Sequence, residues 1–140
     1  MPLDTTLIII IITVLVSLGG FNSDKVMNDL IFYPPAISKQ NQWYRFVTSG
    51  FLHADYTHLF FNMLTLYFFG RGMESFYNLY MGKLGFLIFY IAGIIVSSIP
   101  TFIKHRNDYH YRSLGASGGV SAVVFAYILF VPWTWFTFPP

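Results

Sequence analysis

The sequence predicts an all-α fold, a polytopic bundle of transmembrane helices with four spans in its 140 residues. Hydrophobic residues make up 55% of the chain and charged residues only 10%, where a soluble domain carries roughly 25% charged residues. Aromatic residues reach 21%, which suits surfaces that meet lipid and its interfaces. Long uncharged segments recur along the chain, and lipid forces such segments into helices because it offers no water to the backbone groups.

Composition also excludes several classes of protein and site. The sequence contains no cysteine, so disulfides, thiolate chemistry and cysteine metal sites are excluded. A net charge of +2 is too small to predict binding to nucleic acid. Residues 1–140 have the length of one domain, and we treat them as a single membrane domain.

The first uncharged segment covers residues 5–21, about 26 Å as a helix and close to the ~30 Å hydrocarbon core of a bilayer. A cleaved signal peptide is the alternative. Residues 1–4 carry no Lys or Arg to form the positively charged start of such a peptide. We therefore expect a retained span.

The second apolar segment follows a long mixed segment. Residues 22–55 alternate polar, charged and aromatic residues, a pattern typical of short amphipathic helices lying in the interface, and Pro34-Pro35 interrupts them. The second span is expected over residues 56–74, with a brief connection over residues 78–83.

The third span is expected over residues 84–103, which are uncharged. In it Gly93 and Ser97 are four residues apart, a spacing that lets helices approach closely. The fourth span is expected over residues 117–131. It carries a stripe of small residues that should pack on a neighbouring helix, for which the second span is the expected partner: Gly118, Ala122 and Ala126.

Ser117 lies where a polar loop, residues 104–114, becomes an apolar helix. A hydroxyl at a helix N-terminus is near free N–H groups and the positive end of the helix dipole, which favour developing negative charge. Ser117 is therefore a candidate nucleophile. The alternative is a helix-capping serine among glycines that serve helix packing.

His58 and Asn62 are four residues apart and share one face of the second helix. An attacking serine creates an oxyanion that needs donors aimed at it, and an amide, a histidine N–H and the backbone N–H of Ser117 are suitable. The alternative is a histidine at a helix start and an amide that bonds a neighbouring helix.

Two other chemistries are less consistent with the residues. The segment 115–119 fits the G-x-S-x-G elbow of α/β-hydrolases, but that elbow follows an apolar strand and residues 109–113 are polar. The histidine pairs 53/58 and 105/110 are each five residues apart without the carboxylate of a zincin. We expect no metal and no organic cofactor.

Four motifs in order resemble the rhomboid intramembrane serine proteases: Trp43-Tyr44-Arg45 followed by His53, the run from His58 to Asn62, the run from Gly70 to Glu74, and Gly115-Ala116-Ser117-Gly118. The resemblance covers about residues 42–131. It implies a six-helix core in a lipid bilayer that cleaves transmembrane protein substrates with a Ser–His dyad.

The resemblance also implies roles for individual residues. Ser117 would be the nucleophile, and His58 and Asn62 would stabilise the oxyanion. Structural support would come from Arg45 and Glu74, which hold the first loop and the end of the second helix, from His53, and from Gly115 and Gly118.

The chain departs from the family in two ways. No histidine follows Ser117, whereas the family's catalytic base is a histidine on the sixth helix, and four spans are present instead of six. We expect an N-terminal portion whose catalytic histidine lies beyond residue 140, so that these 140 residues alone are inactive. The alternatives are a non-catalytic rhomboid-like scaffold for membrane clients, and a small transporter or channel.

Charge predicts the orientation opposite to the one the resemblance implies. The first and third loops hold six Lys and Arg and the second loop holds two, so the positive-inside rule places the first and third loops in the cytoplasm. The resemblance implies a cytoplasmic N-terminus, and we adopt that orientation because the first loop is expected to fold and to use its charges internally.

Overall fold

The computed structural model describes residues 4–137, with side chains as far as residue 130. That part of the chain is helical, with one isolated antiparallel bridge between Phe32 and Ser113. The long elements are α1 (Thr5–Asn22), α5 (Tyr56–Thr65), the π-helical segment η2 (Leu66–Gly70), α6 (Arg71–Met81), α7 (Gly85–His105) and α8 (Ala116–Thr137). The short elements are α2 (Asp24–Leu30), α3 (Pro34–Gln40), α4 (Arg45–Thr48) and η1 (Ser49–Phe51).

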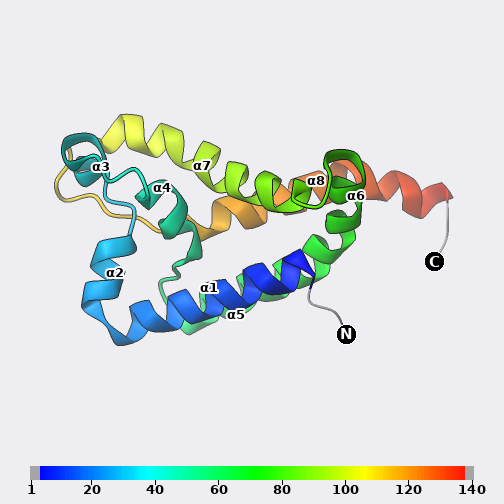
Figure 1. Cartoon of the computed structure of the whole chain (residues 1–140), viewed down its shortest axis with the longest axis horizontal. Helices are drawn as coiled ribbons and strands as arrows, with labels where there is room; N and C mark the ends of the chain where they lie inside the picture. The colour runs from blue at the N-terminus through cyan, green and yellow to red at the C-terminus, as the bar shows by residue number, and fades with distance from the viewer. Residues whose placement is uncertain (1–3, 138–140) are drawn as a thin grey trace.

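The long helices alternate in direction (Figure 1). The short helices α2 to α4 and the loop before α8 gather at one end of the molecule, while α6 and the tight turn into α7 lie at the other (Figure 1). We call these the loop end and the α6 end. Helices α1 and α7 are long and apolar enough to cross a membrane, and the apolar part of α8 described with side chains, Ala116–Phe130, is shorter.

Helices form at all four predicted segments, but the second extends further than expected. The predicted connection at 78–83 is wrong for residues 78–81, because α6 continues to Met81. The side chain of Asn78 accepts a hydrogen bond from the backbone N–H of Phe86, at 3.1 Å. Gly82 then turns the chain with φ +86°, a conformation that glycine adopts without strain.

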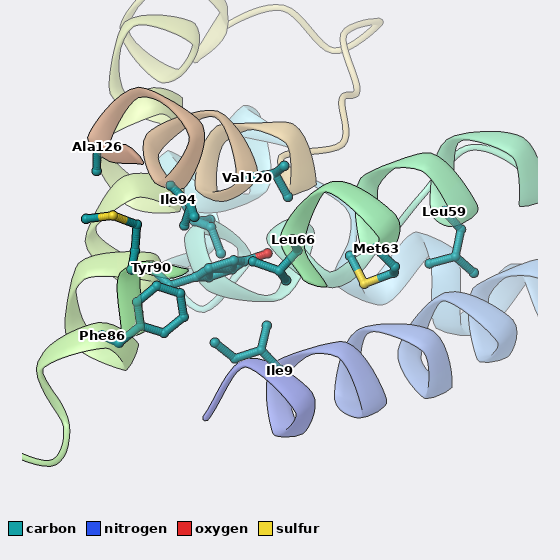
Figure 2. Packing of buried hydrophobic residues seen from close by; sticks show 11 residues of the cluster. Ile9, Leu59, Met63, Leu66, Phe86, Tyr90, Ile94, Val120 and Ala126 are labelled. Carbon is teal, nitrogen blue, oxygen red and sulfur yellow. The ribbon is translucent and has the colours of Figure 1, made fainter. Parts of the chain in front are cut away.

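The core lies where the long elements meet, and each of them contributes at least one buried residue (Figure 2). Ile9 of α1 lies near Leu66, Tyr90 of α7 lies between Ile9 and α8, and Phe86 lies beside them (Figure 2). The other labelled members come from α5, α7 and α8: Leu59, Met63, Ile94, Val120 and Ala126. This cluster fixes the position of α8, and therefore of Ser117, relative to α5.

The small-residue stripe of α8 packs on α7, so the expectation that it faces the second span is wrong for Gly118 and Ala122. A Cβ added at Gly118 would lie 1.9 Å from Ser97 Oγ, and one added at Gly93 would lie 2.8 Å from Ala122 Cβ. Both helices present small residues at the crossing, so their backbones approach more closely than larger side chains would permit.

A carboxylate joins the α6 end of the molecule to the start of α1. Glu74 accepts hydrogen bonds from the backbone N–H groups of Thr5 and Thr6, at 2.9 and 2.8 Å, and from Thr6 Oγ1 at 2.7 Å. Those N–H groups belong to the first turn of a helix and have no partner within it. Negative charge there is also favoured by the helix dipole.

The π-helical segment η2 sets the direction of Glu74. Asn62 and Glu74 are twelve residues apart, which in a regular α-helix would turn them about 120° from each other. One inserted residue in a π-bulge removes about 100° of that difference. Both side chains can therefore point toward α1 and the loop packed on it.

Arg45 ties together the short helices at the loop end. Its side chain is 7% exposed. Nη1 donates to the carbonyls of Asn28 and Ile31, at 2.9 and 2.7 Å, and Nε donates to Gln42 Oε1 at 2.8 Å. A buried guanidinium with several acceptors fixes the loop between α2 and α4.

Candidate active site

Ser117 is the second residue of α8 and its side chain is exposed. It lines a pocket of about 160 Å³ at the loop end, together with His58 and Asn62 of α5. The remaining lining residues come from the segment before α5 and from the start of α8: Leu52, His53, Ala54, Leu114 and Ala116. The fold thus brings the predicted nucleophile and both predicted oxyanion residues into one hollow from two helices.

Asn62 is held in the pocket by His53. The amide Nδ2 lies 2.9 Å from His53 Nε2, and His53 Nδ1 lies 3.1 Å from Ser17 Oγ on α1. Ser17 in turn donates to the carbonyl of Phe51, at 2.8 Å. This chain of contacts links α5 to α1 through the loop residue between them.

His53 is 3% exposed. Burial lowers the pKa of its imidazole from 6.5 to about 4, His58 acts in the same direction, and Asp55 opposes both. Removing a charge from water in this way is costly without a carboxylate partner. His53 is therefore neutral at pH 7 and has one ring nitrogen free to accept a hydrogen bond.

Asp55 caps α5 and holds His58. Its Oδ1 accepts from the backbone N–H of His58 at 2.8 Å, and its Oδ2 lies 2.9 Å from His58 Nδ1. The backbone hydrogen bond is the largest cause that lowers the pKa of Asp55. Because a carboxylate only accepts, Nδ1 of His58 carries a hydrogen, and Nε2 donates only when the ring is the imidazolium.

Ser117 also borders a second, more polar hollow of about 210 Å³, lined on the other side by Ser97, Ser98 and Thr101 of α7. Gly115 separates this hollow from η1. Its N–H donates to the carbonyl of Ser49 at 3.0 Å, and an added Cβ would lie 3.1 Å from Ser49 Oγ. A larger residue at 115 would displace the backbone segment that leads into Ser117.

Two predicted supporting residues, Arg45 and Glu74, lie away from the pocket. Arg45 is buried among the short helices and Glu74 is at the α6 end. His105 stacks on Tyr111, with ring centroids 3.6 Å apart, and His110 is exposed. Among the described residues no group of three His, Cys, Asp or Glu side chains could hold a metal ion.

Sequence reasoning missed Ser17 and Asp55. Asp55 stands three residues before His58, the spacing of a helix cap. Ser17 belongs to a buried face of α1 that carries small or polar residues at helical spacing: Thr6, Thr13, Ser17 and Gly20. That spacing is visible in the sequence and marks the face of α1 that meets other protein rather than lipid.

Comparison with known proteins gives a consistent result. Residues 40–140 match the Rhomboid domain family. The rhomboid-family protein YdcA of Bacillus subtilis is 32% identical over 90 residues, covering 64% of this chain and 42% of YdcA. The rhomboid protease GluP of Bacillus subtilis is 37% identical over 81 residues, covering 58% of this chain and 14% of GluP. Rhomboid-like protein 11 of Arabidopsis thaliana, a chloroplast protein, is 34% identical over 94 residues, 66% of this chain and 31% of its own.

Proposed function

The chain belongs to the rhomboid family, and on that premise we propose that it is the nucleophile-bearing part of an intramembrane serine endopeptidase. The chain spans less than half the length of each relative described above, so the activity proposed is that of the whole protein. Its substrates would be transmembrane proteins, and the protein would be a multi-pass membrane protein with four spans in this segment.

The observation that carries the proposal is the shared pocket of Ser117, Asn62 and His58. These residues come from segments more than fifty positions apart, and they are a hydroxyl and two side chains that can donate hydrogen bonds. A packing role for the serine would not require donors around it. An oxyanion formed at Ser117 would.

The proposed reaction proceeds through an acyl-enzyme. Ser117 Oγ loses its proton to a base and attacks the carbonyl carbon of the scissile peptide bond, whose oxygen takes up the electron pair as an oxyanion. The Asn62 amide, the backbone N–H of Ser117 and, when its ring is the imidazolium, His58 Nε2–H are the donors we assign to it. The amine then leaves with a proton, and water hydrolyses the ester.

The residues of the pocket do not identify the general base that would activate Ser117. A serine hydroxyl is a weak nucleophile without an adjacent base. The histidines of the chain are at positions 53, 58, 105 and 110; His53 is buried, and His58 is assigned as a donor. We propose that a histidine beyond residue 140 completes a Ser–His dyad, so residues 1–140 alone should not cleave peptides.

A purified chain of residues 1–140 tests that assignment. Labelling of Ser117 by a fluorophosphonate in this chain would show that it carries its own base. Loss of labelling in His58→Ala would then identify the Asp55–His58 pair as that base, and loss in His110→Ala would identify the loop histidine instead.

The proposed function itself is tested with the full-length protein and a reporter containing a transmembrane segment. Cleavage that disappears in Ser117→Ala and persists in Ser121→Ala, an exposed serine one turn further along α8, is the expected result. Binding of the reporter without cleavage would favour a scaffold. Solute or ion flux through reconstituted protein, unaffected by Ser117→Ala, would favour a transporter or channel.

A further inference from the structure

Ser17 is fully buried in the middle of α1 and makes two polar contacts outside its own helix. Its Oγ lies 2.8 Å from the carbonyl oxygen of Phe51 and 3.1 Å from His53 Nδ1. A carbonyl has no hydrogen to give, so the single hydroxyl hydrogen of Ser17 points at Phe51. Oγ can then only accept from His53.

This assignment fixes the tautomer of His53. Nδ1 carries the ring hydrogen, and Nε2 presents a lone pair toward Asn62, whose amide nitrogen is 2.9 Å away. If the amide oxygen of Asn62 stood there instead of the nitrogen, its lone pair would face the lone pair of His53 Nε2. The amide must therefore turn its amino group to His53.

The amino group of Asn62 has two hydrogens and His53 takes one. His53 and Asn62 line the same pocket as Ser117. The second hydrogen has no acceptor among the described side chains. It is therefore available to an oxyanion formed at Ser117. If the amide were reversed, its nitrogen would move away from His53 and a carbonyl oxygen would take its place.

We propose that Ser17 and His53 are positioning residues, which set the carboxamide of Asn62 so that its amino group is the one offered to the Ser117 pocket. The catalytic consequence of this inference rests on the proposed function. The proton order, meaning which atom of Ser17, His53 and Asn62 carries the hydrogen in each contact, rests on the hydrogen-bond geometry alone. The neutral state that burial imposes on His53 keeps Nε2 unprotonated at pH 7.

Thr13 provides the matched control. It lies one turn before Ser17 on the same buried face of α1, and its exposed fraction is likewise 0%. Within the described part of the chain, its hydroxyl bonds to the carbonyl of Ile9 in its own helix, at 2.7 Å, and to no other group. Replacing Thr13 by Ala therefore removes a buried hydroxyl without touching the chain from Ser17 to Asn62.

The proton order is measured by ¹⁵N NMR of histidine-labelled full-length protein. We expect the His53 ring, identified by the signals that disappear in His53→Gln, to be neutral with a protonated Nδ1 and a bare Nε2. In Ser17→Ala the ring should gain the Nε2–H form, and in Thr13→Ala it should not. An Nε2–H ring at His53 in the wild-type protein would overturn the inference whatever the activity.

The catalytic consequence is measured by turnover of a transmembrane reporter. Ser17→Ala should lower kcat by at least on the order of tenfold with little change in KM, as part of the 10²–10³ that one oxyanion donor supplies. Ser17→Thr, which keeps the hydroxyl, should recover turnover. Equal kcat losses in Ser17→Ala and Thr13→Ala would overturn the positioning role.

Failure of the proposed function is distinguishable from failure of this inference. Full turnover in Ser117→Ala would refute the proposed function and the kinetic part of the inference together. A wild-type His53 ring protonated at Nδ1 would still establish the proton order in that case.

Discussion

Asn62 has two separate partners, His53 and the proposed oxyanion, and they predict two separate effects of its removal. We expect Asn62→Ala in the full-length protein to lower kcat on the order of 10²–10³-fold, the cost of one oxyanion donor. The lost hydrogen bond to His53 should lower the free energy of unfolding by only about 1 kcal/mol.

The control for Asn62 is Asn22→Ala, which removes an exposed amide that, among the residues the structure describes, bonds only to the carbonyl of Leu18 in its own helix. Reporter kinetics and thermal unfolding are measured on both variants. Equal kcat values for Asn62→Ala and the wild type would show that the amide serves helix packing alone.

His53 predicts how stability depends on pH. Its pKa of about 4 in the folded protein is below the ordinary 6.5, so the unfolded chain binds a proton that the folded chain does not. Stability is therefore complete above about pH 6.5 and falls as the pH falls toward 4, by on the order of 3 kcal/mol at most. Asp55 and His58 are the titratable groups that act on this imidazole.

Thermal unfolding in detergent between pH 7 and pH 4.5 measures this loss. His53→Gln, which cannot titrate, should show a flatter pH dependence than the wild type. His110→Gln, at an exposed position, should retain the wild-type slope. Parallel slopes for His53→Gln and the wild type would contradict a buried neutral His53.

At the scale of elements, the π-helical segment η2 predicts the effect of a single deletion. Deleting Phe68 should restore a regular helix and turn Glu74 about 100° away from the start of α1. Phe68 is 64% exposed, so little core packing is lost with it. We expect the deletion to lower the free energy of unfolding by at least about 0.5–2 kcal/mol, the usual contribution of a helix cap.

Phe68→Ala is the control for that deletion, because it removes the same ring and keeps the register. The two variants are compared by thermal unfolding together with Glu74→Ala. If the deletion were as stable as Phe68→Ala, η2 would not be what directs Glu74 to Thr5 and Thr6.

The crossing of α7 and α8 predicts a strong response at Gly118. A Cβ there would lie 1.9 Å from Ser97 Oγ and 2.8 Å from Ser97 Cβ, so Gly118→Ala should cost about 1–3 kcal/mol by overpacking and should displace Ser117. Ser97→Gly should recover part of that loss in the double variant.

Gly19→Ala is the matched helical control, because its added Cβ would meet only Val26 Cγ1 at an ordinary 3.6 Å. Thermal unfolding of the three variants is the measurement. Wild-type stability in Gly118→Ala would mean that the helices do not cross as closely as the structure places them.

The sequence predicts the helices better than it predicts how they connect and which helices pack together. The positions of α1, α7 and α8 follow from uncharged runs of the chain, each of which forms a helix. The extra residue in η2 is not visible, since Leu66 to Gly70 would suit a regular helix equally well. The partner of Gly118 was misassigned because a stripe of small residues does not name the helix it faces.

In the candidate site, too, the residues are predictable from the sequence while the contacts between distant residues are not. Ser117, His58 and Asn62 were predicted from local spacing and from the order of motifs. The contacts of Ser17 and His53 join residues 36 positions apart, and no local pattern specifies which side chain a buried histidine will face. The tautomer that follows from these contacts is a property of the assembled network.

At the scale of the whole molecule, the two ends have different roles. Glu74 and the Asp4–Arg71 ion pair, at 3.1 Å, close the α6 end. The start of α8 lies at the loop end, near the short helices that Arg45 holds together (Figure 1). Ser117, the second residue of α8, lines its pocket there. The pocket and the Glu74 contacts therefore lie at opposite ends of the molecule.

The central claim is that Ser117 is an activated nucleophile, and covalent labelling tests it most directly. The full-length protein in its membrane is treated with a fluorophosphonate and digested, and the modified residue is identified by mass spectrometry. The account predicts a single adduct on Ser117, formed more slowly in Asn62→Ala and unchanged in Ser121→Ala. An unmodified Ser117 in protein that cleaves its transmembrane reporter would contradict the account.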